Sequence, residues 1–435
     1  MSALRGSGGT PRRAVFYGWI VVGVAFVTLA ISFGVWYSYS VFFLAILKEF
    51  GWSRAATSSI FSVFLLSQAF SGMPTGYLMD RYGPRLVIPS GAVVLAASLA
   101  LVSCSRELWH FQISFGICAA VGVGLTGFVS HTSFLPRWFE RKRGLAMGIA
   151  MSGIGLGTLV MVPVAERLIT LYGWRTTYVI LAAIVFLVAT PLNAFLTRGR
   201  PEDLGLRPDG DGSPGPTHNA APKRVVKVVD PDWVRTEWRL GNAILTRRFW
   251  FMVVAWFFGA YTYQSILLHA VSAIVDAGLS RQAAAYYFGV LGILGSVGKV
   301  FFGHLSDALG RERTNTVAAA ITTLGVACLI WVHWHQGPLP LLFAVLFGLG
   351  YGASAPLLPS IGADIFLGRS FGLIFATISI GGGLGGAAGS YSSGFLRDAA
   401  GTYTVPFLLV VATLWTSCLF VWLAAPRKIR RMVRV

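Results

Sequence analysis

Residues 76–85 read GYLMDRYGPR, and residues 303–313 read GHLSDALGRER. The Gly, Asp and Gly of the first stretch recur in the second at an offset of 227 residues. A second pair, YGWR at 172–175 and AGTY at 400–403, repeats at an offset of 228 residues. Two pairs at nearly one offset indicate that the chain contains two copies of one ancestral unit.

Apolar runs surround both stretches. Many of these runs are about 20 residues or longer, the length that an α-helix needs to cross a hydrocarbon core of roughly 30 Å. Of the 435 residues, 55% are hydrophobic and 12% are charged, and the charged share is roughly half that of a soluble domain. The sequence therefore predicts an all-α membrane protein with twelve transmembrane helices in two six-helix bundles. The predicted spans are 16–45, 55–79, 86–104, 108–134, 144–165, 176–197, 249–273, 283–306, 314–333, 338–360, 371–392 and 404–425.

A polar stretch separates the sixth and seventh predicted spans. It is rich in Gly, Pro and Asp and cannot bury a core, which is typical of a linker. The predicted organisation is an N-terminal bundle at 1–197, a cytoplasmic linker at 198–248, and a C-terminal bundle with a basic tail at 249–435. Duplicated halves of this kind place a solute site at their interface near the membrane midplane.

The distribution of basic residues predicts the orientation. With the N-terminus inside, the inner segments hold 27 of the 35 Lys and Arg residues and the outer loops hold 7. The positive-inside rule then places both termini and the linker in the cytoplasm of a multi-pass plasma (inner) membrane protein. The net charge of +18 reflects this topology and indicates no nucleic-acid partner. The first apolar run is too long for a cleavable signal peptide.

The GxxxDRxGxR pattern of the opening stretch resembles the signature of the major facilitator superfamily. In that family the Asp and Arg lock the cytoplasmic ends of the two halves together. Residues 16–22, FYGWIVV, and 137–153, RWFERKRGLAMGIAMSG, are similar to segments of the monocarboxylate transporters, and the oxalate:formate exchanger branch shares the second segment. The resemblance implies a cytoplasmic gate that consists of Gly76, Asp80, Arg81, Gly83, Arg85, Asp307 and Arg313.

One cation is left inside a predicted span. Lys299 precedes Asp307, at the inner end of the eighth helix, by eight residues, which is about 12 Å of helix and places it near the midplane. Burying a Lys there costs roughly 2.5–3.5 kcal/mol on insertion scales. None of the 17 acidic residues lies in the middle of a span, so we expect an anionic substrate to supply the counter-charge. The competing interpretation is a structural lysine that snorkels or binds backbone carbonyls.

The resemblance narrows the expected substrate. Monocarboxylate transporters carry an Asp and, four residues later, an Arg on helix 8, where this sequence has Gly295 and Lys299. Their vertebrate members also carry a lysine on helix 1, where this sequence has Tyr37. The oxalate exchanger has a second cation on helix 11, and residues 373–380 contain none. One cation fits a monoanion better than a dianion, although Lys orients a carboxylate less strictly than Arg does.

Other polar residues are candidates for the pocket. Tyr261, Ser265 and His269 share one face of the seventh helix, and His269 is able to donate to a carboxylate or to titrate near neutral pH. A structural hydrogen bond between helices explains this polar stripe equally well, and core packing is an equal alternative for Tyr351 as a gate or lid. The predicted substrate-binding residues are Lys299, Tyr37, Tyr261, His269 and Tyr351.

Several chemistries are not expected. The glycine run at 381–386 lacks the strand and the Lys-Ser/Thr of a phosphate loop, so we interpret it as a site of close helix packing or a hinge. The absence of a Walker motif argues against an ATP-driven pump. We expect no cofactor, no metal site and no enzymatic activity.

These observations predict a secondary active transporter of small organic monoanions, such as lactate or pyruvate, that works by alternating access in the lipid bilayer. Proton symport is a hypothesis in which His269 or Lys299 changes protonation with the substrate. An organic anion:anion exchanger of the oxalate/formate type is the alternative within transporters. A non-transporting membrane sensor is the alternative from another class, and it requires a folded soluble domain for which the linker and the tail are too sparse.

Overall fold

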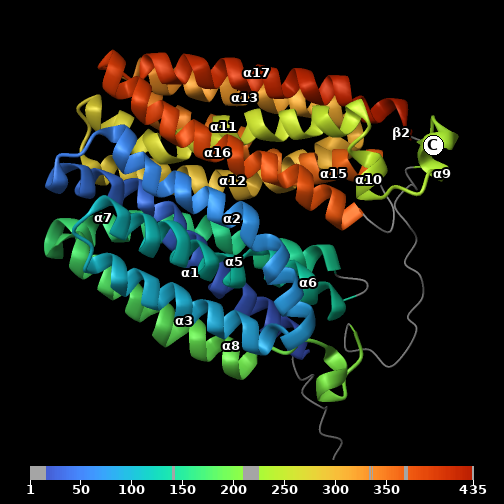
Figure 1. Ribbon diagram of the computed structural model, residues 1–435, viewed down its shortest axis with the longest axis horizontal. Coiled ribbons are helices and arrows are strands. Elements are labelled where there is room, and N and C mark those ends of the chain that lie inside the picture. Colours follow the sequence, from blue (N-terminus) through green and yellow to red (C-terminus); the bar gives the residue numbers. More distant parts are fainter. Residues whose placement is uncertain are drawn as a thin grey trace, which may run out of the picture.

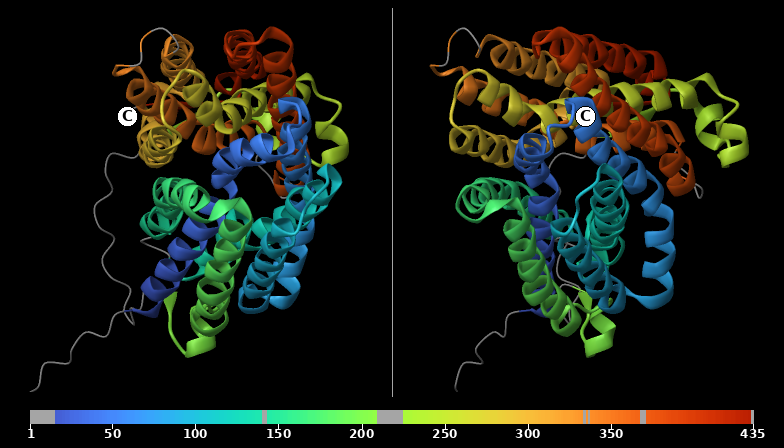
Figure 2. Two further views of the ribbon diagram at one scale, coloured as in Figure 1. Left: turned by 90° about the vertical axis from the view of Figure 1, so that its left-hand side faces the viewer. Right: turned by 60° about the vertical axis from the view of Figure 1, so that its left-hand side comes forward.

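The computed structural model describes residues 16–139, 143–208, 225–332, 335, 337–366 and 371–433. Its long helices form two bundles, one above the other in Figure 1, and Figure 2 shows the same two groups from other sides. The first bundle ends at Leu196 and the second begins at Arg247.

The first bundle begins with three unbroken helices, α1 (Tyr17–Phe50), α2 (Arg54–Tyr82) and α3 (Pro84–Ser103). Its fourth membrane segment is broken into α4 (Leu108–Phe111), the π-helix η1 (Gln112–Ala119), α5 (Ala120–Thr126) and α6 (Phe128–Phe134), and the short 3-10 helix η2 (Leu135–Arg137) follows. The fifth and sixth segments are α7 (Arg143–Ile184), the π-helix η3 (Val185–Ala189) and α8 (Thr190–Leu196).

The second bundle has the same arrangement. It consists of α11 (Arg247–Asp276), α12 (Arg281–Leu309), α13 (Arg311–Trp331), α14 (Leu339–Gly352), α15 (Ser354–Phe366), α16 (Phe371–Ala400) and α17 (Thr404–Ala424). The helices α14 and α15 follow each other and form one crossing, 339–366.

Ten helical stretches in the described part of the chain are long and apolar enough to cross a membrane. One of them, 146–196, contains Gly173 with φ 78° and ψ 160°, so the chain turns there and the stretch makes two crossings. The more polar α2, 29 residues long, is outside the ten and supplies the remaining crossing. The predicted twelve-helix fold is confirmed. The helices α1 and α2 extend five and three residues beyond their predicted ends, because Gly51 and Gly83, rather than the loss of apolarity, end them.

The sequence repeat is also present in the backbone. Gly83 begins α3 with φ 73°, and Gly310 begins α13 at the equivalent place with φ 91°. Only glycine adopts this conformation at low cost, which explains why both copies of the motif keep it. Gly173 and Gly401 form a second pair, with φ 78° and 70°.

We name the two ends of the bundles by their contents. The linker end, at the right of Figure 1, carries short elements of the chain. These are η4 (Pro201–Leu204), β1 (Val225–Val228), α9 (Pro231–Arg235), α10 (Leu240–Ala243), η6 (Pro426–Lys428) and β2 (Arg430–Val433). The distal end is the opposite one, where α1 ends and α2 begins.

The last part of the predicted linker packs on the second bundle. The strands β1 and β2 pair antiparallel, which joins the linker to the chain after α17. The Trp233 indole donates to the carbonyl of Ile365 (2.8 Å), the last turn of α15, and the Trp238 ring packs edge-on against Phe366. The final residues of the range 198–248 are therefore packed on the second bundle, because two tryptophans give them an apolar surface to bury.

The most extensive contacts between the two bundles are those of α2 with α16 and of α7 with α12. Ser62 on α2 donates to the carbonyl of Ala387 on α16 (2.9 Å). A Cβ atom at Gly383 of α16 would overlap Ala69 of α2, and one at Gly155 of α7 would overlap Ser296 of α12. Glycine therefore permits the close approach across the interface. These contacts lie in the distal half and around the middle of the helices, and the bundles diverge toward the linker end in Figure 1.

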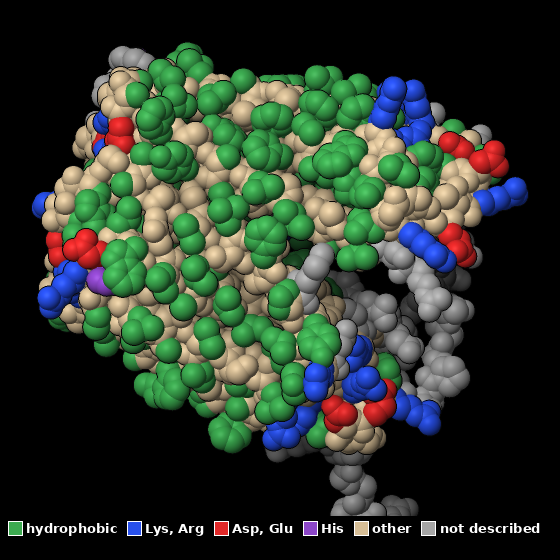
Figure 3. Space-filling view, viewed as in Figure 1, with side chains coloured by type: hydrophobic (Ala, Val, Ile, Leu, Met, Phe, Trp, Pro, Cys, Tyr) green, Lys and Arg blue, Asp and Glu red, His purple; other side chains and the backbone are tan. Residues whose placement is uncertain are grey.

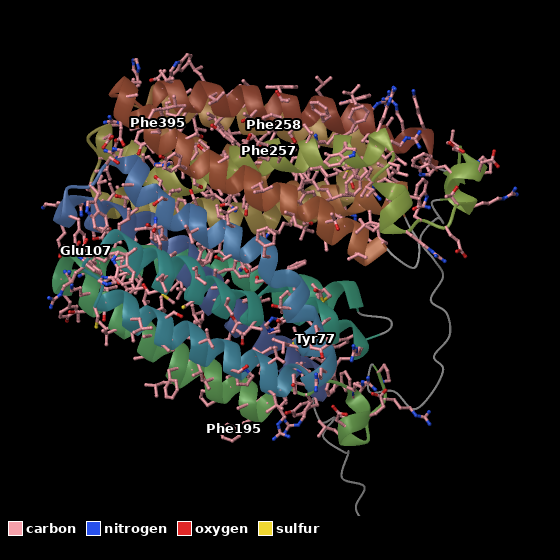
Figure 4. The ribbon with its side chains drawn as sticks, viewed as in Figure 1. Tyr77, Glu107, Phe195, Phe257, Phe258 and Phe395 are labelled. Carbon is pink, nitrogen blue, oxygen red and sulfur yellow. The ribbon has the colours of Figure 1, made fainter. Side chains whose placement is uncertain are left out.

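The surface between the two ends is apolar. Figure 3 shows hydrophobic side chains across the middle of one face, with Lys, Arg, Asp and Glu gathered at the two ends. Large apolar side chains point outward there; Phe195, labelled in Figure 4, is 70% exposed. A soluble protein rarely exposes so much apolar surface, and a lipid bilayer covers it. The chain is a multi-pass membrane protein.

Candidate functional site

A small pocket lies between the two bundles. Helices α1 and α7 of the first bundle and α11, α12 and α14 of the second supply its walls. The lining residues are Tyr37, Ile154, Thr158, Leu267, Phe288, Leu291, Gly292, Gly295, Lys299 and Tyr351.

Lys299 is the cationic residue of this pocket. It lies ten residues before the end of α12 at Leu309, which is about 15 Å of helix and half of a hydrocarbon core. Gly295 and Gly292, one and two turns earlier on the same helix, also line the pocket. Among the described residues Lys299 forms no ion pair, so its charge is not neutralised by a neighbouring carboxylate.

Two tyrosines from different bundles meet at the pocket. The hydroxyl groups of Tyr37 on α1 and Tyr351 on α14 are 2.9 Å apart. The Tyr351 ring also packs against Tyr263, with centroids 5.2 Å apart, and it lies beside Gly295, where a Cβ would be in ordinary contact with the ring at 3.4 Å. The pair is therefore a hydrogen-bonded bridge between the bundles.

The other two predicted pocket residues lie elsewhere. The Tyr261 hydroxyl is 2.6 Å from Ser392 of α16, within the second bundle. His269 is fully buried at the distal end, between Ser58 and Phe43 of the first bundle and Ser390 of the second. The structure thus brings Lys299, Tyr37 and Tyr351 to one pocket, and it places Tyr261 and His269 outside its lining.

The hydrogen bonds of His269 determine its tautomer. Nε2 is 3.0 Å from the carbonyl oxygen of Ser390, which only accepts, so Nε2 carries a proton. Nδ1, 3.2 Å from the Tyr403 hydroxyl, then accepts from it. Burial raises the pKa of the Tyr403 phenol to about 12, so this group remains an O–H donor. Arg54 in turn donates to the Tyr403 oxygen (3.1 Å).

A cluster of charges closes the distal end above His269. Asp276 accepts hydrogen bonds from Arg54 of the first bundle and from Arg397 of the second. Both guanidinium groups also lie 5.4 Å from the centre of the Tyr403 ring. We call Arg54, Asp276, Arg397, Tyr403 and His269 the distal latch. The sequence indicated that Arg54 and Arg397 lie in outer loops, but it did not indicate that both bind Asp276.

The predicted gate residues lie at the linker end. Arg81 donates to the Tyr77 hydroxyl (2.7 Å) on its own helix, and Arg85 donates to the carbonyl of Ala194 (3.2 Å). Gly76 lies in α2, Gly83 starts α3, and Arg313 is exposed in the first turn of α13. The side chains of Asp80 and Asp307 lie outside the described residues. An ion pair that the sequence did not indicate, Arg311 with Asp364 (3.1 Å), joins α13 to α15.

Two helical bundles that embed in a membrane, line a small pocket between them and are latched at one end are typical of a membrane transporter. The comparisons with known proteins agree. The sequence profile of the Major Facilitator Superfamily matches residues 24–390, and the chain belongs to this family, in its monocarboxylate transporter-like branch. Membership in a family of transporters assigns transport, not catalysis, to the chain.

Named relatives place the chain within the family. It is 30% identical over 404 residues to monocarboxylate transporter 13 of Rattus norvegicus, covering 92% of this chain and 86% of that protein. It is 29% identical to monocarboxylate transporter 11 of Homo sapiens, over 94% of this chain and 83% of that one. In fold it is similar to the crystal structure of a bacterial homolog of the human lysosomal transporter Spinster in its inward-facing and occupied conformation. The TM-score is 0.68 at 15% sequence identity, and the match covers 95% of this chain and 97% of that one.

Proposed function

We propose that the protein is a secondary active transporter of small organic monoanions, monocarboxylates such as lactate or pyruvate. The observation that carries this proposal is the position of Lys299, which lines a pocket between the bundles and has no ion-pair partner among the described residues. A buried cation is costly in a membrane, and a carboxylate that enters the pocket offsets this cost. The names of the relatives point to the same substrate class.

The pocket residues have distinct roles in this proposal. Lys299 neutralises the carboxylate as a point charge. The hydroxyl groups of Tyr37 and Tyr351 lie in the same pocket, and one O–H remains free to donate because their mutual hydrogen bond uses only one. Tyr261 and His269 act on the packing and closure of the bundles, since neither lines the pocket in this state.

Transport would proceed by alternating access of two bodies, residues 1–197 and 249–435, joined by the linker 198–248. The distal latch closes one end in this structure. Closing the other end would engage the gate residues Gly76, Asp80, Arg81, Gly83, Arg85, Asp307 and Arg313. The excess of Lys and Arg at the linker end supports a cytoplasmic location for both termini in the plasma (inner) membrane, so this state opens toward the cytoplasm.

Proton symport is part of the proposal. A proton that is coupled to transport must bind at a group whose proton affinity depends on the substrate. Of the two candidates, His269 and Lys299, only Lys299 lines the pocket. Uptake of labelled pyruvate into proteoliposomes should therefore increase when the outside is made acidic. Uptake that ignores the imposed pH gradient, with rapid counterflow at zero gradient, would identify the anion exchanger instead. Binding without any flux would identify the sensor.

Binding tests the role of Lys299 directly. Monocarboxylates should raise the thermal stability of the purified protein, because a ligand that binds only the folded state stabilises it. Lys299→Met, which keeps the side-chain length and removes the charge, should abolish the response, whereas Lys299→Arg should keep part of it. Lys48→Met, at an exposed lysine of the distal end, is the matched control and should respond like the wild type. A full response in Lys299→Met would reject the proposal.

A further inference from the structure

We propose that a second cavity, at the linker end of the first bundle, binds a phosphate group, and that an anionic phospholipid of the adjacent leaflet supplies this group. The cavity has a volume of about 300 Å³, which is at the lower limit of the range typical of ligand sites. It shares no lining residue with the pocket at Lys299. The inference concerns a ligand other than the transported substrate, so it goes beyond the proposed function and does not rest on it.

The charged lining of this cavity is mostly cationic. It consists of Arg85 of α3, Arg137 of η2, Arg200 and Asp203. Arg85 Nε donates to the carbonyl of Ala194 (3.2 Å), and its two Nη groups have no partner among the described residues. The guanidinium groups of Arg137 and Arg200 form no hydrogen bond and no ion pair in the part of the chain that the structure describes. Asp203 Oδ2 accepts from the backbone N–H of Arg200 (3.1 Å).

The first turn of α3 adds to the positive potential. Gly83 and Pro84 line the cavity, and no side chain caps this end of the helix, which is 20 residues long. The first N–H groups of a helix have no partner within it and carry the positive end of its dipole, which favours a phosphate. Guanidinium groups also bind phosphate oxygens through two parallel hydrogen bonds. The combination therefore suits a phosphate group.

The sequence repeat shows that both arginines at the helix ends replace acids. At the offset of 227 residues, Arg85 corresponds to Glu312 of α13. Arg137 corresponds to Asp364 of α15 at the same offset. The register holds around this second pair, because a Ser lies four residues before it and a Phe two residues after it in both copies. The first bundle thus carries a cation at two positions where the second carries an anion.

The second bundle neutralises its own charges at this place. Asp364 binds Arg311 of α13 (3.1 Å). Glu312 is buried and accepts from the backbone N–H of Arg427 (3.1 Å). The first bundle has no carboxylate at either equivalent position. An anion from outside the chain therefore supplies the missing counter-charge.

The position of the cavity favours a phospholipid as the source of this anion. Leu86 follows Arg85 and is 64% exposed, and Phe195, which follows Ala194, is 70% exposed. Figure 4 shows Phe195 on the outer side of the first bundle, and Figure 3 shows Lys and Arg side chains next to the apolar middle at this end. A phospholipid whose chains lie along the apolar side chains reaches the cavity with its headgroup, and basic pockets at this depth bind anionic headgroups.

The test compares three probes on the purified full chain in a neutral detergent, with native mass spectrometry as the readout. Phosphatidylglycerol should bind about fivefold more tightly than phosphatidylcholine or better, because the choline cation offsets the phosphate charge. Binding of glycerol 3-phosphate without any preference for phosphatidylglycerol would keep the phosphate site and overturn its lipid source. Failure of both phosphatidylglycerol and glycerol 3-phosphate to bind would overturn the inference as a whole.

A charge reversal tests the site itself. Arg137→Asp introduces the acid that the second bundle has at this position, and it should lower the affinity for phosphatidylglycerol about tenfold or more. Arg137→Gln, which removes the charge without adding another, should have a smaller effect in the same direction. Because Arg137 is exposed, both variants should unfold at the same temperature as the wild type when no phosphate compound is present.

An arginine outside the cavity provides the matched control. Arg235→Asp makes the same charge change at an exposed residue of α9, also at the linker end, and should leave the affinity for phosphatidylglycerol unchanged. Equal losses in Arg137→Asp and Arg235→Asp would show only a general attraction to a basic surface and would overturn the site. Lys299→Met should keep the wild-type affinity for phosphatidylglycerol even where it abolishes the response to monocarboxylates. Loss of phosphatidylglycerol binding in Lys299→Met would show that the two sites are not separate.

Discussion

Arg54, the first residue of α2, holds Asp276, the last residue of α11, with its Nη2 atom 3.0 Å from both carboxylate oxygens. The two residues belong to different bundles and are 222 positions apart in the sequence. Arg397 binds the same carboxylate at 2.9 Å from within the second bundle. In the proposed alternating-access cycle the bundles separate here when the distal end opens, so the pair would have to break.

Asp276→Asn should shift the protein toward the state that is open at the distal end. The change removes the charge and keeps the shape. The side chains of Arg54 and Asp276 are 14% and 26% exposed, so solvent screens the pair and its loss should cost about 1 kcal/mol, or roughly a fivefold change in population. The measurement is the distance between spin labels at Lys48 and Gln282, two exposed distal positions in different bundles, in a protein without its four native cysteines.

An ion pair within one bundle provides the control. Glu49 and Arg175 bind each other at the same end of the molecule, both in the first bundle. Arg175→Gln should leave the distance distribution between the labels unchanged. If both variants shifted it equally, general loosening of the distal end, rather than the latch, would be the cause.

The Tyr37–Tyr351 bridge predicts a non-additive pair of substitutions. Tyr37→Phe and Tyr351→Phe each remove the same hydrogen bond, which is worth about 1 kcal/mol. Each should shift the distal distance distribution, and the double variant should shift it no further than either single variant. Tyr17→Phe is the control, because the Tyr17 hydroxyl binds the carbonyl of Leu196 within the first bundle (3.0 Å). Additive shifts would show that the two hydroxyl groups act separately.

The fold was predictable because its determinants are local in the sequence. The length of an apolar run decides whether it crosses the membrane, and the repeated glycines at Gly83 and Gly310 mark equivalent turns. The distal pairing was not predictable, because Arg54, Asp276 and Arg397 are charges at loop ends whose partners depend on how the bundles dock.

The candidate site was predictable only in part. A lone cation in the middle of a span and the aromatic residues Tyr37 and Tyr351 stand out in a sequence, and the structure brings them together. Helical periodicity placed Tyr261 and His269 on one face of α11, but periodicity does not say which helix covers that face. Apolar lining residues such as Phe288 carry no signal, since they look like any residue of a membrane helix.

Acidification should open the distal latch through His269. A second proton on Nδ1 would replace its hydrogen bond from Tyr403 and add a positive charge beside Arg54 and Arg397, against the carboxylates of Asp276 and Asp398. Separation of the bundles relieves this crowding of positive charge, so lowering the pH from 8 to 5.5 should favour opening.

His269→Gln tests the source of the pH response. Glutamine keeps a donor for the carbonyl of Ser390 but does not take up a proton in this range. The distance between the distal labels should then be independent of pH. A pH response of the same size in His269→Gln would assign the effect to another group.

Two glycines of α16 should have opposite effects when replaced by alanine, although they are two residues apart. A Cβ at Gly383 would overlap Ala69 of α2 in the other bundle, and a Cβ at Gly385 would overlap the carbonyl of Phe257 on α11 in the same bundle. Separation of the bundles relieves the first overlap, so Gly383→Ala should shift the protein toward distal opening with little change in thermal stability. No transport state relieves the second overlap, and Gly385→Ala should lower the stability by about 1–3 kcal/mol without a selective shift of the distance between the labels. Thermal unfolding measures the change in stability of both variants, and the distance between the spin labels measures distal opening. If both variants lost the same stability, the idea that α16 moves with the second bundle as one rigid body would be wrong.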